Sequence, residues 1–365
     1  MSDMSTPRSN SPSSPSSPSA TSSPRTTAND LSLMRSSLQQ VSKIKLAEVL
    51  FWILAFATPL AFPSHDMMIS EIAITALFAL SLDLVLGYSG IVSLGHAAFF
   101  GLGVYAAALF AKFFIADPLV GLLVCGLFAG ALGWICSFTI LRGSDLTRLM
   151  VTLGVALILL ELANQMDWLT GGSDGLQGVL IGPVLGHFEF DLEGRTAAWY
   201  AISIAMILFL LVRKLVNSPW GYTLRVIRDN RLRAMAIGVP VSRVLISVYT
   251  IAASIAGVAG GVLAQTTGFA SLDVFAFDRS ADLMLMLVIG GVGWLYGGIA
   301  GAIIFKILQS ELSAVTPQYW MFWIGLLLIV LVHVGRDRIK GWFMPVSLWG
   351  RLGKSAQGTS HGGGV

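Results

Sequence analysis

Charged side chains are scarce in this sequence. Asp, Glu, Lys and Arg make up 12% of its 365 residues, whereas hydrophobic residues make up 55%. A soluble domain carries about 25% charged residues, because its surface must be solvated by water. The composition therefore excludes an ordinary water-soluble domain and predicts an outer surface that faces something other than water.

Cysteine is almost absent. The two cysteines, Cys125 and Cys136, lie in one apolar run. On a helix their Cα atoms would be about 16 Å apart, which is well beyond the reach of a disulfide bond. We interpret both as small apolar residues that pack inside the protein.

The sequence also lacks the patterns that accompany catalysis. It has no metal-ligand cluster and no nucleophile–base pair at a recognisable spacing. Residues 353–355 (Gly-Lys-Ser) resemble the end of a phosphate-binding loop, but Leu348 stands where that motif requires glycine. We therefore expect no nucleotide site, no metal and no cofactor in this chain, and a membrane-embedded enzyme is disfavoured.

Long apolar runs dominate the rest of the sequence. About 20 apolar residues of helix cross the hydrocarbon core of a bilayer. Such runs favour α-helices over the alternating segments of an outer-membrane barrel. The sequence thus predicts an all-α, polytopic helical membrane protein. Its apolar spans are 47–63, 67–87, 91–111, 118–140, 146–168, 196–216, 244–268, 282–308 and 319–334.

The two ends of the chain differ in composition from the middle. Residues 9–24 are almost wholly Ser, Pro and other small residues. Such a segment cannot bury enough apolar surface to offset the entropy lost on ordering. The end of the chain is Gly-rich and polar. We expect a disordered N-terminal extension (1–42), a transmembrane domain (43–340) and a flexible C-terminal tail (341–365).

The distribution of basic residues divides the loops into two groups. The basic residues gather before the first span, in the connection 213–243 and after residue 335, whereas the other loops carry mainly acidic residues. The positive-inside rule then places both termini in the cytoplasm. Nine spans would leave the termini on opposite sides. Because glycines interrupt the long run 282–308, we predict two short segments joined near Trp294–Gly297, and ten membrane segments with broken or re-entrant helices.

Residues 87–96 (GYSGIVSLGH) place glycines, serines and a histidine between two apolar spans. They fit a tight cytoplasmic turn, since Gly and Ser are common turn residues, or an unwound segment that enters the bundle and lines a passage. His96 alone is more often a buried, hydrogen-bonded histidine than a ligand. The residues assigned to this candidate translocation path are Gly87, Ser89, Gly90, Ser93, Gly95 and His96.

Glycines spaced four residues apart recur in the later spans. Gly257 and Gly261 form one such pair, which lets two helix backbones approach closely. Direct contact with a solute is the alternative reading. The glycines assigned to helix packing and to the broken helix are Gly290, Gly291, Gly293, Gly297 and Gly298.

The connection after the sixth span has the ends of a short helix. Ser218 fits the N-cap and Pro219 the first helical position, while Gly238 followed by Pro240 fits a stop. Apolar residues alternate with the arginines between these ends. We predict a short amphipathic cytoplasmic helix. The alternative is a positive-inside anchor, which accounts for the arginines but not for the length and the defined ends of the connection.

Few acidic residues lie within the spans. Glu71 and Glu161 fall near predicted span ends, where water can solvate them, and Asp83 near the cytoplasmic end of its span is ambiguous. A proton-coupled carrier needs acids deep in the bundle. An ATP-independent carrier or channel is therefore disfavoured, and it stays an alternative.

Four segments resemble the signature of the branched-chain amino acid ABC transporter permeases, M-type (LivM-like) subunit. They are GYSGIVSLGHAAFFGLGVY at 87–105, LTGGSDGL at 169–176, RVIRDNRLRAMAIG at 225–238 and LMLVIGGVGWLYGG at 285–298. The resemblance implies a permease subunit of an ATP-binding-cassette importer, which forms the translocation path for branched-chain or related amino acids.

The same resemblance implies partners and a place in the cell. The partners are an H-type permease subunit, two cytoplasmic ATPases that bind ATP and Mg, and a periplasmic substrate-binding protein; no nucleic acid is involved. The membrane is the bacterial inner membrane. The substrate stays open, because the binding protein selects it and related permeases move urea or short amides.

Within such an importer the predicted helix 218–238 becomes the ATPase-coupling helix. We expect its contact face to include Ile227, Asp229, Asn230, Ala234 and Met235. The residues assigned to the coupling helix are Arg225, Ile227, Arg228, Asp229, Asn230, Ala234, Met235 and Gly238.

Overall fold

A computed structural model describes residues 46–334 of the protein, except positions 142, 185 and 192. Within this part of the chain the structure is helical, with two isolated β-bridges, Leu176 to Ala270 and Val184 to Phe188, and no strand. The all-α prediction is therefore confirmed. The expected N-terminal extension (1–42) and C-terminal tail (341–365) lie outside the described residues.

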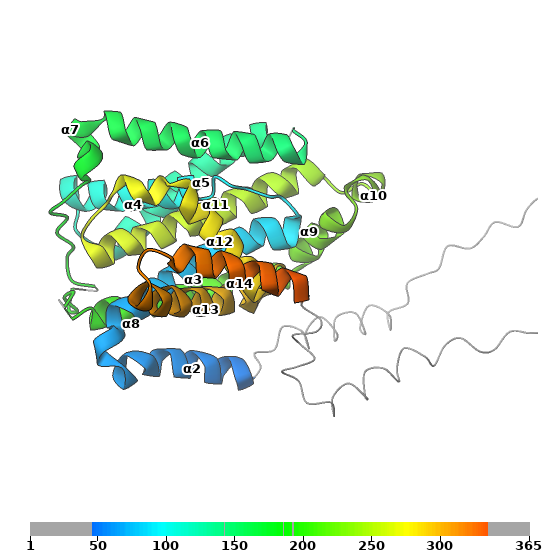
Figure 1. The fold of residues 1–365 in the computed structure, drawn as a ribbon. Coiled ribbons are helices and arrows are strands. Elements are labelled where there is room, and N and C mark those ends of the chain that lie inside the picture. The colour runs from blue at the N-terminus through cyan, green and yellow to red at the C-terminus, as the bar shows by residue number, and fades with distance from the viewer. Residues whose placement is uncertain (1–45, 142, 185, 192, 335–365) are drawn as a thin grey trace, which may run out of the picture. The chain divides into compact units, whose positions relative to one another are not determined.

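The longer helices run along roughly one direction through a single bundle, while α9 and α10 lie at one end of it (Figure 1). Their bounds are α2 Leu46–Ala61, α3 Asp66–Ser89, α4 Ala97–Phe113, α5 Pro118–Ile140, α6 Asp145–Gln165, α7 Asp167–Thr170, α8 Arg195–Val216, α9 Pro219–Asp229, α10 Arg231–Ala236, α11 Val241–Thr267, α12 Phe277–Gly290, α13 Leu295–Val315 and α14 Trp320–Val334, with short 3-10 turns at Pro63–His65, Gly172–Asp174 and Leu272–Phe275.

Each predicted apolar span contains a helix. Among the described residues, 6 helices are long and apolar enough to cross a bilayer, from Pro63–Ser89 to Leu295–Val315. The helices α2, α4, α12 and α14 are shorter, with 16, 17, 14 and 15 residues. The number of ten crossings and the cytoplasmic side of the termini stay predictions.

The long run 282–308 is broken as predicted, although the break at 291–294 lies slightly before the predicted junction near Trp294–Gly297. The chain leaves α12 at Gly290 and enters α13 at Leu295. Gly291 and Gly293 have φ of 114° and 76°, a backbone that residues with a Cβ rarely adopt. The two helices then cross backbone to backbone, since a Cβ built at Gly290 would lie 1.8 Å from the carbonyl oxygen of Gly297.

The helix α11 forms the centre of the bundle and packs against α3, α4 and α5. Small residues make this possible. A Cβ at Gly257 would lie 2.3 Å from the Cβ of Ala129 in α5, and one at Gly260 would lie 2.0 Å from the carbonyl oxygen of Phe100 in α4. Close backbone approach gives dispersion contact where lipid offers no hydrophobic driving force between helices. Cys125 and Cys136 are buried and free in the same region.

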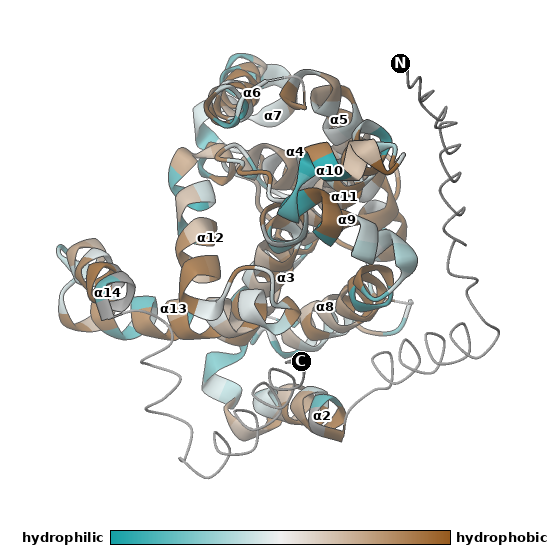
Figure 2. Cartoon of the chain, turned by 90° about the vertical axis from the view of Figure 1, so that its right-hand side faces the viewer, coloured by the Kyte–Doolittle hydropathy of each residue, from teal (hydrophilic) through white to brown (hydrophobic). Residues whose placement is uncertain are grey.

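The outward faces of the helices are apolar (Figure 2). Leu123, Leu127, Ile158 and Ile329 are between 67% and 72% exposed. A soluble monomer rarely exposes such extended apolar surface, whereas a bilayer covers it. The protein is a multi-pass membrane protein.

Candidate functional site

The segment between α3 and α4 lies inside the bundle. The helix α3 ends with Gly90 in the left-handed conformation (φ 73°), and the N–H groups of Gly90 and Ile91 donate to the carbonyl oxygens of Leu86 and Val85 at 3.1 Å. Ile91, Ser93 and His96 are at most 1% exposed. The tight surface turn, one of the two sequence readings, is therefore wrong, and the chain runs unwound through the interior.

Neighbouring helices hold this unwound segment. The N–H of Leu94 donates to Thr152 Oγ1 of α6 at 3.3 Å, and the N–H of Ala97 donates to Ser280 Oγ of α12 at 3.0 Å. A Cβ at Gly95 would lie 1.7 Å from the carbonyl oxygen of Thr152. The glycine is thus required by the approach of α6, and the serine and threonine partners satisfy backbone groups that no helix pairs.

His96 is a packed histidine. Its Nε2 lies 2.8 Å from Ser81 Oγ of α3. Its ring stacks on Phe78 at 5.7 Å between centroids and meets the edge of Phe99 at 5.6 Å. These contacts tie α3 to the start of α4, which agrees with the structural reading of this residue.

The helices are interrupted twice, first at residues 90–96 after α3 and again at residues 291–294 between α12 and α13. The second break packs on the end of α3, where the first break begins. Asp83 is fully buried, and its Oδ1 accepts a hydrogen bond of 2.7 Å from the N–H of Gly293. A Cβ at Gly87 would lie 2.5 Å from the nitrogen of Gly293. The residues between α12 and α13 therefore pack on the last two turns of α3, directly before the unwound segment, and Val292 and Trp294 of this connection are 39% and 57% exposed. Asp83, ambiguous in the sequence, helps to hold this connection.

The connection after α8 is two helices, and the single helix predicted for it is wrong. Ser218, Pro219 and Gly238 mark the ends as predicted, with Gly238 at φ 86°. Asn230, however, is extended (φ −159°, ψ 102°), and its Oδ1 accepts a hydrogen bond of 2.9 Å from the N–H of Arg233. Asparagine competes for backbone groups in this way and starts a new helix, α10.

The predicted contact face of this connection is wrong at two positions. Ile227 is 3% exposed and Ala234 is fully buried, because α9 packs on α3, α8 and α11 while α10 packs on α9 and α11. Their side chains belong to the protein's own interior. An amphipathic helix that lies on a bundle turns its apolar side inward. The sequence alone does not show whether that apolar side packs on the same chain or on another protein.

Two arginines of α9 also turn toward the bundle. The Arg225 guanidinium lies 5.4 Å from the ring centroid of Tyr88 and 5.3 Å from that of Tyr222. Arg228 Nη1 donates a hydrogen bond to the carbonyl oxygen of Gly87. The reading of the arginines as orientation signals alone misses these contacts. Tyr222 lies one turn away in α9, whereas Tyr88 and Gly87 belong to α3, far away in the sequence.

The outer surface of α9 and α10 faces the viewer in Figure 2. Asp229, Asn230 and Met235 are exposed there, as predicted for a contact face. Leu232 is 75% exposed and Ile237 is 67% exposed, and the sequence reasoning missed both. The sequence did contain a signal for Leu232 and Ile237, because they are large apolar residues on a short polar connection.

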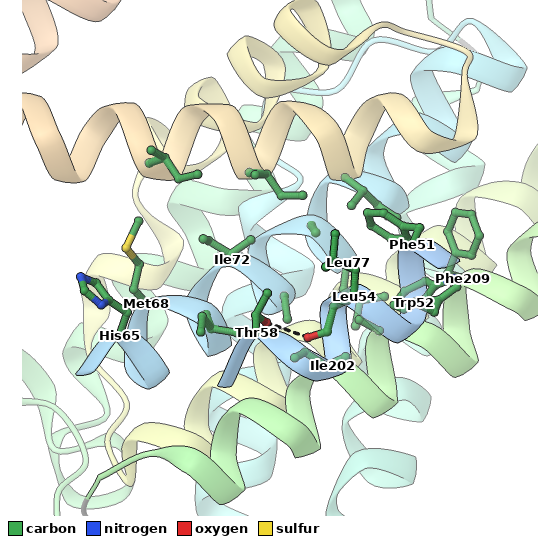
Figure 3. A pocket seen from close by; sticks show the side chains of 18 of the residues that line it. Phe51, Trp52, Leu54, Thr58, His65, Met68, Ile72, Leu77, Ile202 and Phe209 are labelled. Carbon is green, nitrogen blue, oxygen red and sulfur yellow. Dashed lines mark hydrogen bonds between the residues drawn. The ribbon is translucent and has the colours of Figure 1, made fainter. Parts of the chain in front are cut away.

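A separate pocket of about 470 Å³ lies between α2, α3, α8 and α13 (Figure 3). Its walls are almost wholly apolar, with side chains such as Phe51, Ile72 and Leu77. The hydroxyl of Thr58 is engaged with the carbonyl oxygen of Ala55 at 2.7 Å. His65 and Glu311 are the ionisable side chains of the lining. A zwitterionic solute would lose most of its hydration against the remaining apolar walls, so the pocket suits an amino acid poorly.

No group of three His, Cys, Asp or Glu side chains that could hold a metal ion occurs among the described residues.

Comparison with known proteins matches residues 65–332 to the family model described as branched-chain amino acid transport system / permease component. The high-affinity branched-chain amino acid transport system permease protein LivM of Escherichia coli is 28% identical, covering 80% of this chain and 73% of that protein. The LivH permease of the same organism is 24% identical (76% and 91%), and the fructose import permease FrcC of Rhizobium meliloti is 26% identical (58% and 61%). No solved structure matches the chain significantly.

Proposed function

This chain belongs to the family of permease components of branched-chain amino acid transport systems and is a permease subunit of an ATP-binding-cassette importer; we propose that it forms the translocation path for a branched-chain or related amino acid. The relatives named LivM and LivH support an amino acid. A relative named for fructose import supports keeping other solutes open.

The two broken segments carry the proposal for the path. Non-helical backbone at membrane depth is tolerated where protein buries it or where it lines a cavity. Residues 291–294 contact Asp83 and Gly87 near the end of α3, and residues 90–96 continue from that same end. Both segments leave the regular helices. We place the path along the end of α3, with the backbone of Gly87–His96 as its lining. The Ser89 hydroxyl donates to the carbonyl oxygen of Val85, so we assign Ser93 as the hydroxyl group of the lining.

The partners follow from the same assignment. We propose an H-type permease as second membrane subunit, two ATPases that supply the ATP and Mg chemistry, a periplasmic binding protein that delivers the solute, and the bacterial inner membrane as the location. On this proposal the chain hydrolyses no ATP and holds no cofactor. The presence of both LivM and LivH among the relatives supports two kinds of permease subunit.

The coupling surface is the exposed side of α9 and α10. We propose that an ATPase binds Asp229, Asn230, Leu232, Met235 and Ile237, with Gly238 ending the surface. Apolar anchors of this size give a short helix its affinity in a groove, while the carboxylate and amide fix its register. Ile227 and Ala234 support this surface from behind.

Reconstitution of the complete complex in vesicles tests the function. We expect ATP-driven uptake of labelled leucine, competed by isoleucine and valine, only when the binding protein and both ATPases are present. Leucine accumulation by this chain alone would instead support an ATP-independent carrier. Uptake of urea or a short amide in place of leucine would keep the importer and replace its substrate.

A further inference from the structure

One side chain links the coupling surface to both broken segments. Arg228 Nη1 donates to the carbonyl oxygen of Gly87, in the last turn of α3. A Cβ at Gly90 would lie 3.0 Å from Arg228 Cγ, and a Cβ at Gly293 would lie 3.0 Å from Arg228 Nη1. The arginine stem therefore passes over the first break, and its guanidinium lies between the two breaks.

The bond to Gly87 completes the end of α3. The last carbonyl oxygens of a helix have no partner within it. Those of Val85 and Leu86 receive the N–H groups of Ile91 and Gly90, and that of Gly87 receives Arg228. A cation is favourable at this end of a helix dipole. The end of α3 is thus capped from another helix, α9, which lies at the surface.

From Gly87 the connection continues to the second break. Asp83 lies one turn earlier in α3 and accepts the N–H of Gly293 at 2.7 Å. No space separates Gly87 from Gly293, because a Cβ at Gly87 would lie 2.7 Å from the Cα of Gly293. A displacement of the end of α3 therefore displaces the chain between α12 and α13.

We propose that Arg228 is the positioning residue that transmits a displacement of α9 to the two broken segments of the translocation path. The inference rests on the proposed function, since an ATPase must move α9. Arg228 is suited to the role because it shares the helix α9 with the exposed Asp229 and reaches Gly87 across 141 residues of sequence. It acts through the backbone and touches no solute in this assignment.

The test uses the complete complex and a reporter at the second break. Val292 is 39% exposed and lies between α12 and α13. The substitution Val292→Cys introduces a thiol there, while Cys125 and Cys136 are buried. We would measure its alkylation rate with and without ATP, together with leucine uptake, ATP hydrolysis and ATPase co-purification.

The variant is Arg228→Met, which keeps a stem over Gly90 and removes both the donor to Gly87 and the ion pair of 3.6 Å with the exposed Asp229. We expect the ATPases to remain bound, the ATP response of the introduced thiol to vanish, and the leucine moved per ATP to fall by roughly 5- to 150-fold, the usual range of coupling between two sites. Arg228→Lys keeps a cationic donor and should restore part of the response. Arg243→Ala removes an exposed arginine of α11 and should behave as the parent.

Each other outcome is decisive. If Arg228→Met responds to ATP and transports like the parent, the inference is wrong. If it loses the ATPases or no longer assembles, whether or not Arg228→Lys does the same, Arg228 is a docking or purely structural residue, and the inference is also wrong. If the parent binds ATPases but its thiol ignores ATP, this inference alone fails. If the parent binds no ATPase, the proposed function fails with it.

Discussion

Asp83 and Gly293 are joined by a hydrogen bond of 2.7 Å although 210 residues separate them in the sequence. The carboxylate is fully buried, and the N–H belongs to a residue in the left-handed conformation. The bond fixes the break between α12 and α13 against α3. In a membrane interior a buried backbone N–H needs such a partner.

The first prediction concerns this bond. Asp83→Ala leaves the N–H of Gly293 without its acceptor and should lower the free energy of unfolding by about 1–3 kcal/mol. Asp83→Asn keeps an acceptor oxygen and should lose clearly less. Denaturant titration of the purified chain in detergent measures both. Equal losses for the two variants would show that the charge, rather than the hydrogen bond, matters.

The second prediction separates the interior of the coupling region from its surface. Ala234→Glu places a carboxylate where the native side chain is fully buried, and burying an unpaired charge is strongly unfavourable. We expect a poorly folded protein. Leu232→Glu changes a side chain that is 75% exposed and should leave folding intact while the ATPases are lost. Gel filtration and ATPase co-purification measure the two effects. A well-folded Ala234→Glu protein that loses only its ATPases would contradict the assignment.

The third prediction concerns the packing of α11. Gly260→Ala would bring a Cβ within 2.0 Å of the Phe100 carbonyl oxygen. The helices must separate, and overpacking of this kind costs about 1–3 kcal/mol. Gly154→Ala in α6 is the matched control, because nothing lies within 4 Å of a Cβ at that position. Thermal unfolding in detergent should show a lower midpoint for Gly260→Ala alone. A lowered midpoint in both variants would point to a general effect of the substitution.

The fourth prediction concerns sidedness. Glu193→Cys and Leu232→Cys each introduce an exposed thiol into a chain whose two cysteines are buried. With both termini in the cytoplasm, a membrane-impermeant reagent added to intact cells should label the first and spare the second. A permeant reagent should label both. The reverse labelling pattern would show that the topology is inverted. Labelling of both thiols by the impermeant reagent would show that residues 193 and 232 lie on the same side of the membrane.

The sequence alone determined the long apolar helices and indicated the family. Apolar length is a local property, and α5 at Pro118–Ile140 coincides with its predicted span. Pro219 and Gly238 bound the coupling region because proline at a helix start and glycine past a helix end act through their own backbone. The motif at 87–105 suggested the family for a related reason. A motif is recognised from the order of its residues, without knowing which other residues they contact.

Only the tertiary structure decided which way each residue of the site faces. Ala234 and Leu232 stand two positions apart on one short helix, yet one is fully buried and the other is 75% exposed. Arg228 reads as one more cytoplasmic charge until Gly87, 141 residues away, is placed beside it. The partner of a side chain across such distances is set by how helices pack, and neither apolar length nor helix-end signals carry that information.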